Sequence, residues 1–165
     1  MADCNNIRGF TIKNGTSGIK INSNNNSIIG NFIIDNIRGG VVAENSEFNK
    51  IIENRIINNF YGIQLYEKSH YNLISNNLIR KSYWTGIMIG NPVVPLILIN
   101  KNYYPAIGTD NSSYNTIEKN SLINPISNTV FYECKTNFWD SNYWGRPRIF
   151  PKIIRGSDEY DEKMD

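Results

Sequence analysis

Apolar and polar residues alternate in short runs along this chain, and the runs return at a fixed distance. The clearest run is 49–57, Asn-Lys-Ile-Ile-Glu-Asn-Arg-Ile-Ile. Similar segments lie at 26–34, 72–79 and 115–123. A second kind of run, glycine followed by alternating apolar residues, begins at Gly18, Gly40, Gly62 and Gly86. Period-2 alternation predicts short strands that turn one face inward, so the pattern indicates stacked coils of about 22–23 residues.

Two solenoid classes have repeats of this length. A leucine-rich repeat needs Leu at fixed positions and a helical or 3₁₀ return segment. Here Ile occupies the inward positions, Gly and Asn interrupt the runs, and no stretch has a sustained 3.6-residue period. We therefore predict an all-β fold, a single-stranded right-handed parallel β-helix of about 4–5 coils.

One asparagine recurs at the same point of each repeat. It stands at Asn31, Asn54, Asn77 and Asn120, in steps of 23, 23 and 43 residues, the last being one period plus a 20-residue insertion. Equivalent residues of a solenoid stack on one another, and an amide side chain can both donate and accept. The spacing thus predicts an asparagine ladder at one corner of the coil, with a structural role.

The charges narrow the possible functions. The chain has 17 Lys and Arg against 15 Asp and Glu, for a net charge of +2. This balance argues against a nucleic-acid partner or a membrane-surface protein. No apolar run reaches the about 18 residues of a transmembrane helix, so we expect no membrane span. Residues 1–4 lack the features of a signal peptide.

The sequence predicts no disulfide, metal site or cofactor. Cys4 and Cys134 would lie about four coils apart, roughly 20 Å at ~4.8 Å per strand, which is too far for a disulfide. No spacing typical of metal ligands occurs.

These repeats resemble the right-handed parallel β-helix repeat family of the pectate-lyase-like superfamily. The likeness is closer to the NxIxxNxI…GIxL coils of surface and periplasmic β-helix repeat proteins, which include periplasmic copper-binding proteins, and it covers about residues 5–134. The resemblance implies the fold and an extracellular or cell-surface location. Because the family includes polysaccharide lyases, hydrolases, epimerases and proteins without a known reaction, it does not fix the chemistry.

Enzymes on this scaffold place carboxylates and basic residues on adjacent coils. Glu44 and Glu67 are 23 residues apart, so we expect them to stack roughly 5 Å apart. Such a pair could serve in catalysis or hold a cation, Ca²⁺ in the case of an enzyme. Asp35, Asn58 and Lys81 form another column in steps of 23, which could hydrogen-bond a sugar. In an enzyme, Asp35 and Lys81 would join the two glutamates as catalytic candidates. All of these residues could equally be solvated turn residues.

An insertion at 90–113 separates two repeats. Its Tyr103 and Tyr104, with Tyr83 and Trp84 just before it, could form an aromatic platform for sugar rings, since aromatic faces pack on the apolar faces of sugars. Alternatively, residues 93–99 form an extra strand along the side of the helix.

The predicted organisation is therefore coils over 1–136, a C-terminal cap over 137–156 and a disordered acidic tail over 157–165. Trp139, Tyr143 and Trp144 would cover the open end of the solenoid. No comparable segment precedes the first coil, so we expect self-association there or a longer helix.

The function favoured by the sequence is a non-catalytic β-helix domain of an exported or cell-surface protein that contacts a polysaccharide or glycan. A polysaccharide lyase, hydrolase or epimerase is the alternative. A structural fragment from the C-terminal part of a larger solenoid is a third hypothesis.

Overall fold

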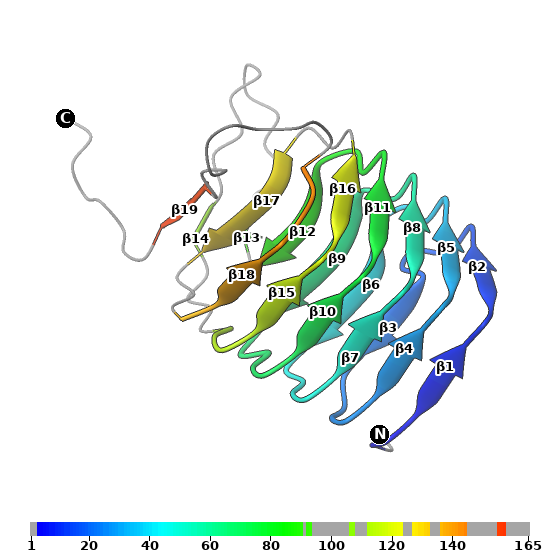
Figure 1. The fold of residues 1–165 in the computed structure, drawn as a ribbon, viewed down its shortest axis with the longest axis horizontal. Helices are drawn as coiled ribbons and strands as arrows, with labels where there is room; N and C mark the ends of the chain where they lie inside the picture. The colour runs from blue at the N-terminus through cyan, green and yellow to red at the C-terminus, as the bar shows by residue number, and fades with distance from the viewer. Residues whose placement is uncertain are drawn as a thin grey trace.

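The computed structural model describes residues 3–90, 112–123 and 136–144 in full, and the backbone of 92–93, 106–107, 127–132 and 155–157. Over these residues every regular element is a β-strand, and all strands except one short antiparallel pair stack into three parallel sheets around one core (Figure 1). The predicted all-β parallel β-helix is confirmed. In the described part of the chain, no helix is long and apolar enough to cross a membrane.

The three sheets have six, five and six strands. Sheet A consists of β1 (Asn6–Arg8), β4 (Ser27–Ile29), β7 (Lys50–Ile52), β10 (Leu73–Ser75), β15 (Thr116–Glu118) and β18 (Phe138–Asp140). Sheet B consists of β2 (Thr11–Lys13), β5 (Phe32–Ile34), β8 (Arg55–Ile57), β11 (Leu78–Arg80) and β16 (Ser121–Ile123). Sheet C consists of β3 (Ile19–Ile21), β6 (Gly39–Glu44), β9 (Tyr61–Tyr66), β12 (Thr85–Ile89), β17 (Ser127–Tyr132) and β19 (Arg155–Ser157).

Each coil passes through sheets A, B and C in turn, so β1, β2 and β3 form the first coil and β4, β5 and β6 the second. We call the turns between consecutive sheets the A–B, B–C and C–A corners. Neighbouring coils are in register, with Ile33 opposite Ile56 and Ile56 opposite Ile79. A given position of the coil therefore forms a column that runs along the solenoid at about 4.8 Å per step.

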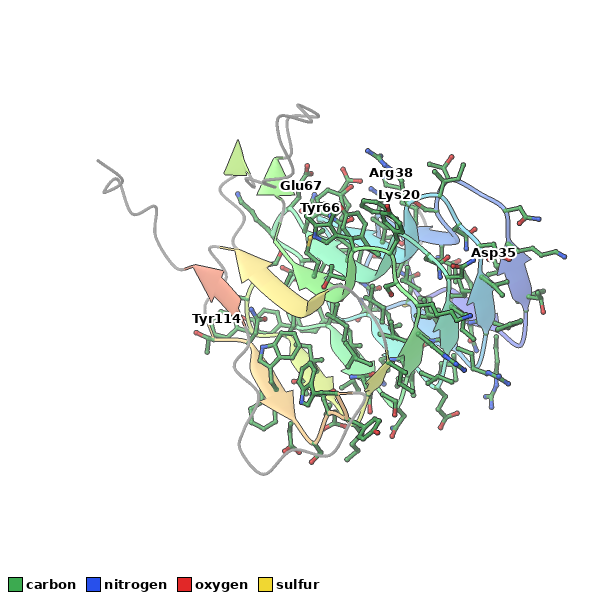
Figure 2. All side chains as sticks on the ribbon, turned by 90° about the horizontal axis from the view of Figure 1, so that it is seen from above. Lys20, Asp35, Arg38, Tyr66, Glu67 and Tyr114 are labelled. Atoms are coloured by element: carbon green, nitrogen blue, oxygen red, sulfur yellow. The ribbon has the colours of Figure 1, made fainter. Side chains whose placement is uncertain are left out.

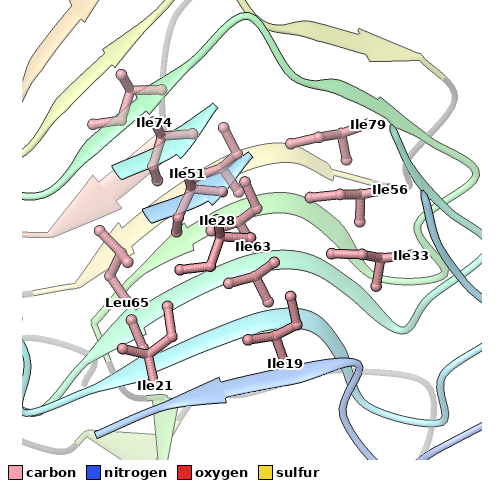
Figure 3. Close-up of a cluster of buried hydrophobic side chains, with 14 of the residues drawn as sticks. Ile19, Ile21, Ile28, Ile33, Ile51, Ile56, Ile63, Leu65, Ile74 and Ile79 are labelled. Carbon is pink, nitrogen blue, oxygen red and sulfur yellow. The ribbon is translucent and has the colours of Figure 1, made fainter. Parts of the chain in front are cut away.

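The core consists of aliphatic columns, one or two for each sheet. Figure 3 shows Ile28, Ile51 and Ile74 of sheet A stacked beside Ile33, Ile56 and Ile79 of sheet B, and all six are fully buried. Sheet C contributes Val41, Ile63, Ile87, Ala43, Leu65 and Ile89. β-branched Ile suits strands, which explains why Ile fills these columns.

Glycine recurs close to the start of the sheet C strands because neighbouring coils pack closely on each other there. A Cβ atom on Gly40 would lie 2.4 Å from Cγ2 of Ile56 and 2.8 Å from the carbonyl oxygen of Gly62. On Gly62 it would lie 2.4 Å from the carbonyl oxygen of Gly86. The recurring glycine of the second run is thus required by close packing of one coil on the next.

The aromatic residues of the predicted cap continue the coil. β18 pairs with β15 and sets Trp139 opposite Ile117, while Tyr143 bridges to Ser121 of sheet B. Trp139 and Trp144 pack against the core, so two indole rings stand where other coils have aliphatic side chains. β19 adds a strand to sheet C, which places Ser157 in the sheet and not in the predicted tail; residues 158–165 lie outside the described residues.

The insertion between β12 and β15 contains one described element, an antiparallel pair of β13 (Pro92–Val93) and β14 (Ala106–Ile107). The single extra strand predicted over 93–99 is not tested beyond Val93, because 94–100 lie outside the described residues.

Candidate functional site

The A–B corner holds the predicted asparagine ladder. Oδ1 of Asn54 accepts hydrogen bonds from the backbone N–H and from Nδ2 of Asn31, both at 3.0 Å. Nδ2 of Asn54 donates to the carbonyl of Ile28 at 2.8 Å and to Oδ1 of Asn77 at 3.0 Å. The pattern repeats from Asn77 to Asn120 and on to Asn142, which the sequence analysis did not include. Each amide therefore satisfies a backbone N–H and a backbone carbonyl group of the preceding coil.

The C–A corner holds a second ladder that the sequence analysis missed. It comprises Asn5, Asn26, Asn49, Asn72, Asn115 and Asn137. These asparagines open the repeated segments and share the spacing of the first ladder, which was the available signal.

The B–C corner is different, because its ladder is short. Asn59 accepts from the backbone N–H and Nδ2 of Asn36, both at 2.9 Å. In the first coil Gly15 stands at the ladder position, and its backbone N–H donates to Oδ1 of Asn36 in the second coil. In the fourth coil Ser82 occupies the corner. This corner lacks the uniform asparagine column of the other two corners. Its exposed side chains are described below, after the two glutamates.

The predicted stacking of Glu44 on Glu67 is wrong. Glu44 lies opposite Tyr66, because the B–C corner of the third coil is one residue shorter. Asn36 and Asn59 are equivalent, as are Val41 and Ile63, yet 41 − 36 = 5 whereas 63 − 59 = 4. The C–A corner restores the register with one extra residue, and Glu67 stands there with φ 53°.

Glu44 instead belongs to a polar network at the end of sheet C. It pairs with Nζ of Lys20 at 2.5 Å and accepts from Nδ2 of Asn22 at 3.1 Å. The hydrogen bond from Lys20 lowers the pKa of Glu44, and burial followed by the hydrogen bond to Glu44 raises the pKa of Tyr66. In Figure 2, Lys20, Tyr66 and Glu67 gather on one side of the molecule, away from Tyr114. An ionised, lysine-paired carboxylate is a poor general acid.

The column of Asp35, Asn58 and Lys81 is present at the B–C corner. All three have left-handed backbone conformations, with φ of 56°, 56° and 55°, which Asn and Asp tolerate better than most residues. Nδ2 of Asn58 donates to Oδ1 of Asp35 at 2.5 Å, and all three residues are exposed. The column presents a carboxylate, an amide and an ammonium group to solvent on consecutive coils.

Aromatic side chains lie beside this column. Tyr83, 67% exposed, stacks on Phe60 with ring centroids 5.5 Å apart. The ring centroids of Trp84 and Tyr61 lie 5.8 Å and 4.8 Å from that of Phe60. We call Phe60, Tyr61, Tyr83 and Trp84 the corner aromatics. The sequence analysis named Tyr83 and Trp84 but missed the other two, and Tyr103 and Tyr104 lie outside the described residues.

A second set of aromatic residues lines the C–A corner. Phe48, Tyr71 and Tyr114 form a stack with centroid distances of 5.1 and 5.3 Å and interplanar angles of 4° and 11°. Their φ values are 55°, 54° and 59°, uncommon for bulky residues, and each is about half exposed. The rings cover one another's faces, so this stack offers mainly ring edges to a ligand. Sequence analysis did not identify it, although the steps of 23 and 43 residues match the ladders.

The structure thus brings four of the predicted site residues, Asp35, Lys81, Tyr83 and Trp84, to one corner. It leaves Glu44 and Glu67 at the far end of the sheet C strands, in different surroundings. The B–C corner combines flat apolar rings with hydrogen-bonding groups on three consecutive coils, and it can hold a ligand that offers both apolar and hydroxyl surfaces.

Comparison with known proteins agrees with this fold. The family model described as periplasmic copper-binding protein (NosD) matches residues 2–155, which confirms the resemblance to periplasmic β-helix proteins. Among solved structures, the chain is similar to the periplasmic alginate epimerase AlgG, with a TM-score of 0.60 and 16% identity. The match covers 84% of this chain and 39% of that chain, so it concerns the fold alone. No curated protein sequence matches this one.

The family's description makes copper a ligand to test against these residues. Copper prefers imidazole, thiolate and thioether ligands, and the sequence contains one His, two Cys and three Met. Nδ1 of His70 accepts a hydrogen bond from the backbone N–H of Ser113 at 3.0 Å. Cys4 is exposed in the first coil, and Met88 is fully buried in β12. Among the residues that the structure describes, no three His, Cys, Asp or Glu side chains gather. These residues do not fit a copper site, and we derive no copper chemistry from them.

Proposed function

The chain belongs to the family of the periplasmic copper-binding protein NosD, and from this premise we propose that it is an exported, non-catalytic β-helix domain that contacts carbohydrate through its B–C corner. The observation that carries the proposal is the position of the corner aromatics beside the Asp35–Asn58–Lys81 column. Asn58 stands two residues before Phe60, and Lys81 two residues before Tyr83.

The chemistry of this corner suits a sugar chain. Aromatic rings pack on the apolar C–H faces of pyranose rings while carboxylate, amide and ammonium groups exchange hydrogen bonds with hydroxyl groups. Tyr83 is 67% exposed, and its contact with Phe60 orients the ring before a ligand binds. A preoriented ring loses less conformational entropy on binding.

Two features favour binding without catalysis. Glycoside cleavage by two carboxylates requires them to flank one bond at a defined separation, and Glu44 is instead paired with Lys20. Asp35 is the one carboxylate in the column at the B–C corner, and it accepts a hydrogen bond from Asn58. The hydrogen bond from Lys20 lowers the pKa of Glu44, whereas a general acid at neutral pH needs a raised pKa.

A glycan array with the purified chain tests this function. We expect binding that falls at least 10-fold in Tyr83→Ala, because the exposed ring of the site is lost. Tyr114→Ala is the matched control, since it removes a half-exposed tyrosine ring from the C–A corner. A silent array, or an equal loss in the two variants, would refute carbohydrate contact at the B–C corner. Glycan cleavage by the intact chain would refute the non-catalytic assignment.

A further inference from the structure

We propose that the glycan is an anionic polysaccharide, a chain of uronic acid residues, and that its carboxylates bind the outer face of sheet B next to the B–C corner. This inference rests on the proposed function and names the ligand class of the same site. It adds a surface, the outer side chains of sheet B, that the sequence analysis did not consider.

The outer face of sheet B is basic. Its five strands contain Lys13, Arg55 and Arg80, all exposed, and no Asp or Glu. Neither these residues nor Lys81 forms an ion pair with a described residue. The two ion pairs among the described residues join Lys20 to Glu44 and Lys119 to Glu118. With a net charge of only +2 for the whole chain, this face concentrates positive charge that is not neutralised locally.

The other sheets do not share this feature. The strands of sheet A carry Arg8 and Lys50 but also Glu118 and Asp140. In sheet C, Lys20 is paired with Glu44. The charge asymmetry is therefore a property of one face, and not of the chain in general.

The two arginines are positioned as a pair. The guanidinium carbon of Arg55 lies 5.5 Å from the ring centroid of Phe32 on the preceding coil, a cation–π contact that restricts the side chain. Arg80 is on the next strand, two residues further along, because Leu78 is the residue opposite Arg55. From strand spacing and rise their Cα atoms are on the order of 8 Å apart. Arg binds planar carboxylates in a bidentate manner.

The positive face is continuous with the aromatic corner. Arg80 ends β11 and Lys81 follows it directly, two residues before Tyr83. A chain whose ring packs on Tyr83 could continue across Lys81 and Arg80 to Arg55 on the neighbouring coil. Equivalent positions recur at about 4.8 Å along the solenoid, comparable to one sugar ring of an extended chain.

Two acidic residues border this path and limit it. Asp35 lies in the column with Lys81, where Asn58 donates to it, and Glu53 lies at the A–B corner two residues before Arg55. The path of highest positive charge therefore crosses the third and fourth coils, between Arg55 and Lys81, and not the second coil.

The test compares polygalacturonate with its fully methyl-esterified form, which has the same backbone without carboxylates. We expect the intact chain to bind polygalacturonate at least 10-fold more tightly, with affinity that falls as salt is raised. The double variant Arg55→Glu/Arg80→Glu should lose at least 10-fold in affinity for polygalacturonate. The control Arg8→Glu/Lys50→Glu has the same change in net charge on exposed sites of sheet A and should lose less than 3-fold. Thermal unfolding of both variants verifies that they are folded.

Three results would overturn the inference. Equal affinity for the charged and the esterified polymer would leave the proposed carbohydrate contact standing but remove the anionic preference. Equal losses in the two double variants would mean that net charge, and not sheet B, governs binding. Anionic phospholipid vesicles or duplex DNA that bind more tightly than polygalacturonate, with the same dependence on Arg55 and Arg80, would assign the face to another partner.

Discussion

The A–B and B–C corners are made by the same coils, yet they use their residues differently. At the A–B corner one asparagine repeats from Asn31 to Asn142; it is buried as far as Asn120 and partly buried at Asn142. At the B–C corner the ladder consists of Asn36 and Asn59, and exposed aromatic and charged side chains follow it. Where backbone groups must be satisfied inside the stack, the residue type is fixed by structure. Where a shorter ladder satisfies the backbone groups, the residue type can vary from coil to coil. The exposed aromatic and charged side chains are found at that corner.

The largest effect should come from breaking the continuous ladder at its centre. In Asn54→Ala, the backbone N–H and Nδ2 of Asn31, the carbonyl of Ile28 and Oδ1 of Asn77 lose a partner inside the protein. Each buried polar group left unpaired costs about 1–3 kcal/mol, so we expect a loss of about 4 kcal/mol in the free energy of unfolding. Chemical denaturation followed by circular dichroism measures it.

The matched variant is Asn36→Ala at the B–C corner, where the ladder ends. We expect a loss of about 2 kcal/mol, because fewer groups of neighbouring coils depend on Asn36. If both variants cost the same, the distinction between a continuous and a short ladder has no energetic basis.

The next effect concerns the glycine column at the start of sheet C, where Gly40 and Gly62 are the second residues of β6 and β9. In Gly40→Ala, the new Cβ would lie 2.4 Å from Cγ2 of Ile56. Overpacking of this kind costs about 1–3 kcal/mol. Gly30→Ala is the control, because its φ of 64° is strained for alanine while no atom lies within 4 Å of the new Cβ, and strain alone costs about 1 kcal/mol. Thermal melts that show the control to be the more damaging change would contradict the close-packing explanation.

The ladder and the core were predictable because their signal is repetition. Steps of 23 residues from Asn31 to Asn77, together with the hydrogen-bonding capacity of the amide, require a stacked column. The same regularity would have identified the second ladder at Asn26, Asn49 and Asn72. Regular spacing is informative wherever each coil has the same number of residues.

The stacking of Glu44 and Glu67 could not be predicted from spacing, because two neighbouring corners differ in length by one residue. Nothing in Ile37-Arg38-Gly39 and Phe60-Tyr61 reveals which positions are equivalent, and the 23-residue step is restored within the same coil. The corner aromatics were predicted in part for a related reason. Tyr83 and Trp84 were grouped with an insertion that follows them in sequence, whereas their partner Phe60 precedes them by one coil.

A smaller effect on stability is expected at the aromatic side of the comparison. Tyr83→Ala removes a largely exposed ring that contacts Phe60, and we expect a loss of about 0.5–1.5 kcal/mol, the range for one aromatic pair. A loss above about 2 kcal/mol in chemical denaturation would show that the corner aromatics hold the fold together, which would weaken their assignment to a ligand.

The smallest effect is expected from removing the charge of Glu44, which lies outside the core. The pKa of Glu44 is lowered, chiefly by the hydrogen bond from Lys20. A lowered folded-state pKa means that the carboxylate stabilises the fold above its unfolded pKa of about 4.3, and that this contribution is lost as the pH falls through the folded-state pKa. Stability should therefore differ between the intact chain and Glu44→Gln at pH 7, and the difference should vanish well below pH 4.

Because Lys20 is about half exposed, solvent and salt screen the pair, and we expect a shift of at most a few degrees in Tm at pH 7. Melting curves of the two proteins from pH 2 to pH 8, at low and high salt, measure it. Glu53→Gln is the control, since Glu53 is exposed at the A–B corner and takes no part in the Lys20–Glu44 pair. If Glu44→Gln and the control had equal pH profiles, the Lys20–Glu44 pair would not contribute to stability. The residues at the end of sheet C could then be replaced at as little cost in stability as those at the B–C corner.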